Sequence, residues 1–226
     1  MNGNVLQDYG WNGNDAPCSC DYIVPTILEL LERLGVHRVL DLGAGNGALC
    51  SVIGKTGREA VGLEYDKAGV EFARSSFPGI RFYNYGVQDD PSELLAVEPP
   101  FDAVVSTEVV EHLFSPHLLP IYAAQTLRSD GLLIVSTPYH GYFKNLALAL
   151  LNKWDFHHNP LWHGGHIKFW SRATLCRLLT EHGFKILQFH GVGRIPYLWK
   201  SMIIVAQKVE TAASRIRLAS SNRAPH

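Results

Sequence analysis

The sequence has few cysteines, no long apolar run and no excess of charge of either sign. Its 226 residues include four cysteines, too few for the disulfide framework of a small secreted protein. The longest apolar run, residues 146–151, is far shorter than the roughly 20 residues that a membrane-spanning helix needs. The net charge of −1 argues against a strongly basic nucleic-acid binder and an acidic disordered chain.

A secretion signal is also absent from the first residues, MNGNVLQDYGWNGND, which contain neither a basic segment nor an apolar one. Cys18 and Cys20 are too closely spaced for a common zinc site, and no second pair follows them. Scattered cysteines suit a reducing compartment. We therefore expect a cytoplasmic protein, with peripheral contact to a membrane as an additional role.

Histidine is the residue type in excess, and its distribution is uneven. The chain has 11 histidines, and residues 154–170 also hold three of its five tryptophans. By composition alone this would suggest a metal protein. Five of the histidines lie in one short stretch, namely His140, His157, His158, His163 and His166.

The order of the apolar runs predicts an α/β fold. Short β-rich runs occupy residues 38–42, 60–64, 80–85, 103–106 and 132–137, and stretches of helical character at 48–55, 67–75, 92–96 and 118–127 separate them. Continuous apolar strands that alternate with helices are typical of a parallel sheet covered on both faces. We expect a flexible arm at 1–20, one domain at 21–207 and a polar tail at 208–226.

The alternation breaks after Thr137. Residues 138–170 form an insert that carries the histidines and one apolar helix, expected over 142–154. A helix over 171–182 follows, and then two strands at 184–190 and 198–207. Because a short loop joins these two strands, they must be antiparallel.

A glycine-rich turn predicts a nucleotide site. The run VLDLGAGNGAL (39–49) places Asp41 at a strand end, three glycines in the turn and a helix directly after it. Glycines there let the backbone approach a ligand closely and adopt positive φ. Glu64, at the end of the next strand, is placed to bind ribose hydroxyls.

This run resembles the first motif of the class I S-adenosylmethionine-dependent methyltransferases. The resemblance implies a Rossmann-like three-layer sandwich with a mostly parallel seven-stranded sheet, order 3-2-1-4-5-7-6, in which strand 7 is antiparallel. It also implies S-adenosylmethionine as cofactor. Asp41, at the end of the first strand, would lie near its methionine part and Gln88 near its adenine. The implied cofactor-binding residues are Asp41, Gly43, Gly45, Glu64, Gln88 and Thr107.

Within that family, Glu108-Val-Val-Glu111-His112 and Gly165-His166-Ile167-Lys168-Phe169 are most similar to the ubiquinone-pathway O-methyltransferases. The resemblance implies O-methylation of a small apolar acceptor, such as a phenolic or prenylated ring. The insert departs from those enzymes and leaves the acceptor open. Two alternatives are a catalytically inactive cofactor-binding regulatory protein and an RNA 2′-O-methyltransferase, which would need a basic groove that the composition does not indicate.

The histidines and carboxylates after the fourth strand are the candidates for chemistry. If a helical turn begins there, Glu108, Glu111 and His112 share one face and suit Mg²⁺ or another divalent metal. In the small-RNA 2′-O-methyltransferases the same run plus a later histidine chelates a metal, a role that His163 or His166 would take here. The alternative is that these side chains form hydrogen bonds locally, with His112 or His166 as general base and His140 facing the acceptor.

The apolar helix expected over 142–154 has three interpretations. It is a plain cap over the sheet edge, an apolar channel for the acceptor, or a helix that lies on a membrane surface. The sequence favours the first without excluding the others.

Overall fold

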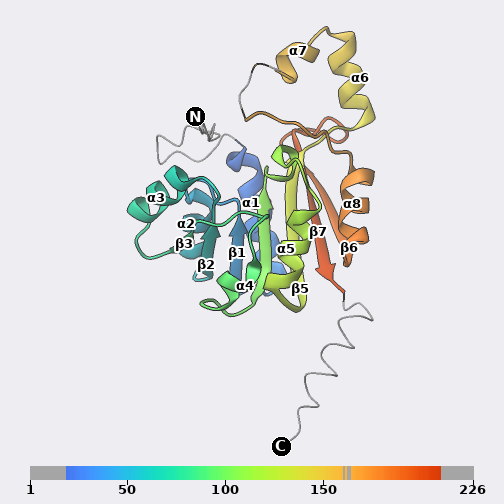
Figure 1. Cartoon of the computed structure of the whole chain (residues 1–226). Helices are drawn as coiled ribbons and strands as arrows, with labels where there is room; N and C mark the ends of the chain where they lie inside the picture. Colours follow the sequence, from blue (N-terminus) through green and yellow to red (C-terminus); the bar gives the residue numbers. More distant parts are fainter. Residues whose placement is uncertain (1–18, 160, 162–163, 210–226) are drawn as a thin grey trace, which may run out of the picture.

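The computed structural model describes residues 19–159, 161 and 164–209, so most of the expected N-terminal arm and C-terminal tail, together with His163, lies outside the described residues. Seven strands form one sheet of order β3-β2-β1-β4-β5-β7-β6 (Figure 1). The strands are β1 (Arg38–Leu42), β2 (Glu59–Leu63), β3 (Arg81–Tyr83), β4 (Phe101–Thr107), β5 (Leu127–Pro138), β6 (Phe184–Val192) and β7 (Ser201–Lys208). β7 pairs antiparallel with β5 and β6, and the pairs among β1–β5 are parallel, which confirms the expected topology.

Helices cover both faces of this sheet. One apolar cluster joins the sheet to α1 (Cys20–Arg33), α2 (Ala48–Lys55) and α3 (Lys67–Ser76). A second joins it to α4 (Pro91–Leu95), α5 (Leu118–Thr126) and α8 (Arg172–Glu181). Alternate residues of one strand serve opposite clusters, as Val39 and Leu40 do in β1. The three-layer sandwich follows from strands that are apolar on both sides.

Several boundaries differ from the expected ones for local reasons. The strand expected over 132–137 begins at Leu127, because Phe101 pairs with Leu127 before the register shifts. The helix expected over 142–154 is two helices, α6 (Tyr142–Leu150) and α7 (Trp154–His157). Asn152, at φ +51, separates them, and a left-handed residue cannot continue a right-handed helix.

The insert lies beyond the carboxyl edge of the parallel strands. Figure 1 shows α6 and α7 standing above that edge, away from the helices of the sandwich. Among the described residues, no helix is long and apolar enough to cross a membrane. This edge is where open α/β sheets bind their ligands.

Candidate active site

The glycine turn after β1 has the backbone geometry that the motif predicts. Gly43, Gly45 and Gly47 have φ values of +91°, +54° and +80°. A Cβ on Gly43 would lie 2.4 Å from Cγ2 of Val109, and one on Gly47 would lie 2.7 Å from Cζ of Phe82. Only glycine therefore fits these two positions without displacing a packed side chain.

Asp41, in β1 just before this turn, has a carboxylate oxygen without a hydrogen-bond partner among the described residues. Its carboxylate is buried; Oδ2 accepts a hydrogen bond from Sγ of Cys50 at 3.4 Å, and Oδ1 has no hydrogen-bond partner among the described residues. Burial raises the pKa of Asp41 to about 7. A buried acceptor with spare capacity suits the positively charged methionine part of S-adenosylmethionine.

Glu64, the next residue after β2, organises the same turn. Its Oε2 accepts a hydrogen bond from the backbone N–H of Gly45, and its Oε1 accepts one from that of Asp66, both at 2.8 Å. Burial raises the pKa of this carboxyl above its ordinary value. Each carboxylate oxygen still has a second lone pair, so Glu64 can also accept from ribose hydroxyls.

The other two predicted cofactor residues lie at the same edge of the sheet. Thr107 is the half-buried last residue of β4. Gln88 lies in the turn after β3; it is exposed, and its side chain folds over Gly86. The structure thus brings the predicted cofactor residues to the carboxyl ends of β1–β4, where open α/β sheets bind ligands.

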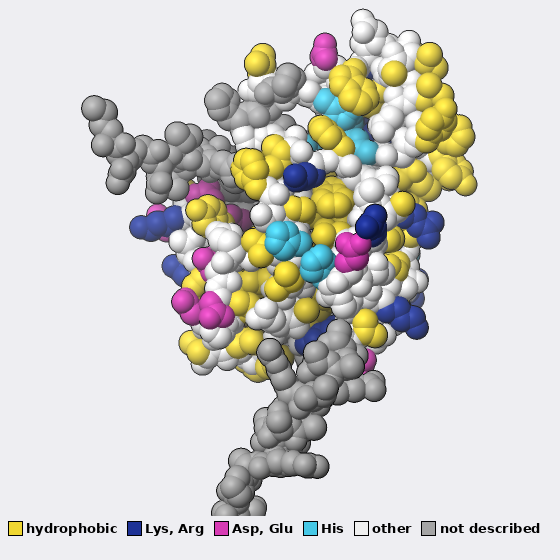
Figure 2. Space-filling view, turned by 45° about the vertical axis from the view of Figure 1, so that its right-hand side comes forward, with side chains coloured by type: hydrophobic (Ala, Val, Ile, Leu, Met, Phe, Trp, Pro, Cys, Tyr) yellow, Lys and Arg dark blue, Asp and Glu magenta, His cyan; other side chains and the backbone are white. Residues whose placement is uncertain are grey.

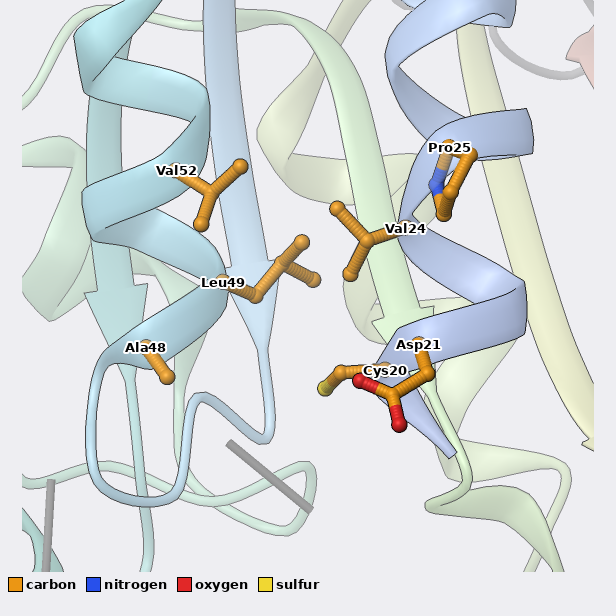
Figure 3. Close-up of a pocket in the computed structure, with 7 residues that line it drawn as sticks. All are labelled: Cys20, Asp21, Val24, Pro25, Ala48, Leu49 and Val52. Carbon is orange, nitrogen blue, oxygen red and sulfur yellow. The ribbon is translucent and has the colours of Figure 1, made fainter. Parts of the chain in front are cut away.

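An apolar pocket of about 280 Å³ opens beside the glycine turn, between α1 and α2. Ala48 and Leu49 of its lining follow Gly47 directly in the chain. Figure 3 shows Leu49 and Val24 pointing towards each other across this space, with Asp21 at the lower end of α1. Its lining thus comes from the first turns of α1 and α2.

The Glu-x-x-Glu-His run does not form the helical turn from Glu108 on which the sequence prediction depended. The turn is a 3₁₀-helix, η1 (Val110–His112), that begins after Glu108, and Glu108 itself has φ +55. The carboxylate of Glu108 accepts hydrogen bonds from the hydroxyls of Ser136 at 3.0 Å and Ser201 at 3.2 Å. Burial raises its pKa to about 7.

Glu111, His112 and His166 converge instead. One ligand atom from each lies within 4.8 Å of the others, and the two imidazole rings are 5.0 Å apart. Oε2 of Glu111 accepts from the Thr137 hydroxyl at 2.9 Å, whereas the buried Oε1 has no hydrogen bond within the described chain and lies 4.0 Å from Nε2 of His166. The backbone N–H groups of Ile167 and residue 168 donate to the carbonyl of Glu111, which holds the two segments together.

The environment favours the neutral form of both imidazoles. Nδ1 of His112 lies 2.7 Å from the carbonyl oxygen of Gly164, so it carries the proton and the lone pair is on Nε2. Burial lowers the pKa of His112, and burial together with His112 lowers that of His166 to about 4. Neutral imidazoles can accept a proton or bind a metal.

His140 leaves β5 at the same edge but lies in a different cluster. It is buried against Phe169 and His158, with ring centroids 5.1 and 5.3 Å away. Burial and nearby Lys144 lower the pKa of His140 to about 3. His140 is thus not one of the three described residues that converge as possible metal ligands, Glu111, His112 and His166.

Sequence reasoning missed the polar residues that hold these carboxylates. Ser136 and Thr137 bind Glu108 and Glu111, and Ser201 reaches Glu108 from β7. Lys144, in α6, is buried, and its Nζ donates to the carbonyl of Lys200 at 3.3 Å. The available signal was the pair of hydroxyl residues at the end of an otherwise apolar strand.

The comparisons with known proteins identify the family of this chain. The family model for a methyltransferase domain matches residues 17–189, and the chain belongs to this family. A ubiquinone biosynthesis O-methyltransferase of Roseobacter denitrificans is 32% identical over 81% of this chain and 77% of its own. A probable S-adenosylmethionine-dependent methyltransferase of Mycolicibacterium smegmatis is 29% identical over 73% of this chain, which covers 60% of that relative.

Solved structures share the fold. The putative methyltransferase in a complex with the Haloferax volcanii Trm112 activator superposes with a TM-score of 0.63 at 16% identity, over 82% of this chain and 89% of its own. Magnesium protoporphyrin IX methyltransferase from Synechocystis, with bound S-adenosylhomocysteine, gives a TM-score of 0.58 at 19% identity, over 82% and 81% of the two chains. The fold is the one these methyltransferases share, and the family is that of the methyltransferase domain.

Proposed function

We propose that this protein transfers a methyl group from S-adenosylmethionine to a hydroxyl of a small apolar acceptor, such as a phenolic or prenylated ring. The convergence of Glu111, His112 and His166, in a segment whose Val109 packs against Gly43 of the glycine turn, carries this proposal. It supplies neutral imidazoles where an acceptor hydroxyl would face the cofactor. The ubiquinone biosynthesis O-methyltransferases among the relatives support the choice of oxygen as the methylated atom.

The reaction is an in-line displacement that these residues would assist. The acceptor oxygen forms a bond to the methyl carbon as the carbon–sulfur bond breaks, and the sulfonium becomes a neutral thioether. The hydroxyl proton passes to Nε2 of His166 or of His112. Positioning by the sheet edge and the insert supplies much of the rate, and a general base adds a factor of about 10²–10⁴.

A divalent metal is the alternative use of the same three side chains. Two imidazoles and a carboxylate with an orphaned buried oxygen form a suitable donor set. An ion held by Glu111, His112 and His166 would lower the pKa of the acceptor hydroxyl. Glu108 is not part of this group, because its carboxylate is engaged by Ser136 and Ser201.

The test measures transfer of labelled methyl to a catechol that carries an alkyl chain, with its fully methylated analogue as the control acceptor. We expect a methyl ether, and we expect His166→Gln to lower kcat by about 10²–10⁴ with unchanged cofactor affinity. His182→Gln, at another half-buried histidine, is the matched control. Cofactor binding without transfer to a broad panel of hydroxyl acceptors would favour the regulatory alternative, and transfer to RNA ends would favour the nucleic-acid alternative.

Titration with Mn²⁺, followed by electron paramagnetic resonance, distinguishes the mechanism with a histidine base from the mechanism with a metal ion. If a metal is used, wild-type protein binds Mn²⁺, Glu111→Gln weakens that binding and a chelator abolishes turnover. If a histidine is the base, turnover survives the chelator.

A further inference from the structure

A second group of histidines lies in the insert. The ring centroid of His140, which follows β5, lies 5.3 Å from that of His158 and 6.2 Å from that of His157, at the end of α7. The ring of Phe169 packs against His140 and His158, with centroids 5.1 and 4.9 Å away. Figure 2 shows histidine side chains gathered among hydrophobic ones in the upper part of the molecule, where Figure 1 places α6 and α7. We call His140, His157, His158 and Phe169 the insert cluster.

Two nitrogens of the insert cluster are buried without a hydrogen bond. Nε2 of His140 and Nε2 of His158 have no partner among the described residues, and His140 as a whole is only 9% exposed. Buried polar atoms in folded proteins are nearly always paired with protein, water or ligand, because an unpaired one costs free energy. His157 and Phe169 are exposed, so solvent reaches the rim of the cluster. The cluster therefore has a hydrogen-bonding capacity that its own packing does not use.

This capacity suits hydrogen bonding to a ligand and not metal binding. In the part of the chain that the structure describes, Glu111, His112 and His166 are the one group of side chains with the spacing of metal ligands. An imidazole N–H donates to an oxygen acceptor, and a neutral ring can carry its proton on either nitrogen. The ligand that fits the insert cluster is therefore one that offers oxygen acceptors.

The charges that act on the insert cluster are mostly positive. Lys144, buried in α6, interacts with all three histidines, and Arg194 of the β6–β7 loop interacts with His157. Burial, and then the charge of Lys144, lowers the pKa of each of these histidines below its ordinary value. Glu108 partly offsets the charge of Lys144, whereas Asp155 of α7 is exposed. A negatively charged ligand would relieve the unfavourable charge interactions within the cluster.

We propose that the insert cluster, together with Lys144 and Arg194, binds an anionic oxygen group, a phosphate or a carboxylate, of an otherwise apolar acceptor. The cluster adjoins the candidate active site, since Phe169 follows His166 by three residues and the charge of His158 acts on His166. The acceptor would then present its hydroxyl to His166 and its anionic group to the insert. The binding of an anion stands by itself, whereas its assignment to the acceptor rests on the proposed function.

Binding of small anions, followed by the NMR signals of the histidine rings, tests the site itself. The probes are phenyl phosphate, benzoate and the neutral benzamide, each added to the full-length protein without acceptor or cofactor. We expect the signals of His140 and His158 to shift saturably with at least one of the two anions, and the tighter-binding anion identifies the group. Benzamide should not shift them. No saturable shift with either anion, or an equal shift with benzamide, would overturn the proposal.

The variant His140→Phe/His158→Phe keeps two aromatic rings and removes their nitrogens. It should weaken binding of the preferred anion about tenfold or more, because two charge-assisted hydrogen bonds are lost. Calorimetry measures this affinity, and calorimetry with S-adenosylmethionine verifies the fold; His158→Phe alone is the second variant if the double one does not fold. His182→Phe, at a half-buried histidine that follows α8, is the matched control and should bind the anion as the wild type does. Unchanged affinity in the cluster variants, or an equal loss in the control, contradicts the site.

Methyl transfer shows whether the anion belongs to the acceptor. A catechol whose side chain ends in the preferred anion should have a KM about tenfold below that of its neutral analogue, and His158→Phe should remove most of this difference. Equal KM values together with intact anion binding would overturn the assignment to the acceptor. Because the anion titrations need no turnover, they remain decisive even if methylation of a hydroxyl fails.

Discussion

At the scale of single residues, the two acids of the predicted cofactor site, Asp41 and Glu64, differ in their hydrogen bonds. Glu64 has a backbone N–H on each oxygen, whereas Asp41 has one weak thiol donor and an oxygen without a partner. Burial without compensation raises the pKa of Asp41 to about 7. This carboxyl is therefore the group that a bound cation would change most.

We predict that cofactor binding is coupled to proton release from Asp41. In the free protein Asp41 is protonated below about pH 7, and a bound sulfonium or ammonium would favour the ionised form. The apparent affinity should therefore fall as the pH drops below 7, by at most about tenfold per pH unit. Calorimetry at pH 6 in buffers of different ionisation enthalpy measures the released proton, and Asp41→Asn should abolish it. An unchanged proton count in that variant would contradict the assignment.

We also predict that Glu64→Ala damages the turn as well as cofactor binding. The substitution leaves the backbone N–H groups of Gly45 and Asp66 without their carboxylate, which costs about 1–3 kcal/mol each if they stay unpaired. Thermal denaturation should show a lower Tm even without cofactor. A variant with wild-type Tm and weakened cofactor binding would restrict Glu64 to ligand contact.

At the scale of elements, the junction of the glycine turn and α2 is fixed by backbone conformation and by packing together. Gly47 and Gly57 have similar φ values, +80° and +84°. A Cβ added to Gly47 would meet the side chain of Phe82, whereas a Cβ added to Gly57 would meet nothing within 4 Å. Substitutions at the two glycines therefore distinguish the cost of a strained backbone from the cost of a clash with a core side chain.

Alanine at each position should reveal this difference. Gly57→Ala should lower the free energy of unfolding by about 1–2 kcal/mol, the cost of a left-handed alanine. Gly47→Ala should cost about 1–3 kcal/mol more, because Phe82 must move. Urea denaturation measures both, and equal losses would show that Phe82 yields freely.

At the scale of the whole molecule, a buried lysine links helix α6 of the insert to the sandwich. Nζ of Lys144, in α6, donates to the carbonyl of Lys200, and the carboxylate of Glu108 interacts favourably with the Lys144 ammonium. Burial nevertheless lowers the pKa of Lys144 to about 8. The buried ammonium of Lys144 therefore holds α6 against the sandwich, while the other side chains of α6 are exposed or half-buried.

Lys144→Met should loosen the insert without unfolding the sheet. We expect hydrogen exchange over residues 142–157 to become about tenfold faster, as loss of a charged hydrogen bond of about 1.5 kcal/mol implies. Exchange in β1 and β4 should not change. The exposed Lys153→Met is the control, and equal effects of the two substitutions would remove Lys144 from this role.

The sequence by itself determined the sandwich, the strand order and the glycine turn. Strand periodicity and the positions of glycine and Asp41 are local signals, and the family resemblance supplies the order of the strands. The bounds of β1 and α2 agree with the expected ranges 38–42 and 48–55.

Only the tertiary structure decided which polar residues meet and which way α6 faces. Glu108 and Glu111 are three residues apart, and Glu108 has a positive φ. The carboxylate of Glu108 binds Ser136 and Ser201, whereas that of Glu111 lies beside His166. The apolar periodicity of α6 does not say whether its leucines pack inwards, because the pattern only shows that the helix has an apolar and a polar side. The hydrogen bond of the buried Lys144 to Lys200 decides which side faces the protein. These choices depend on contacts between residues far apart in the chain.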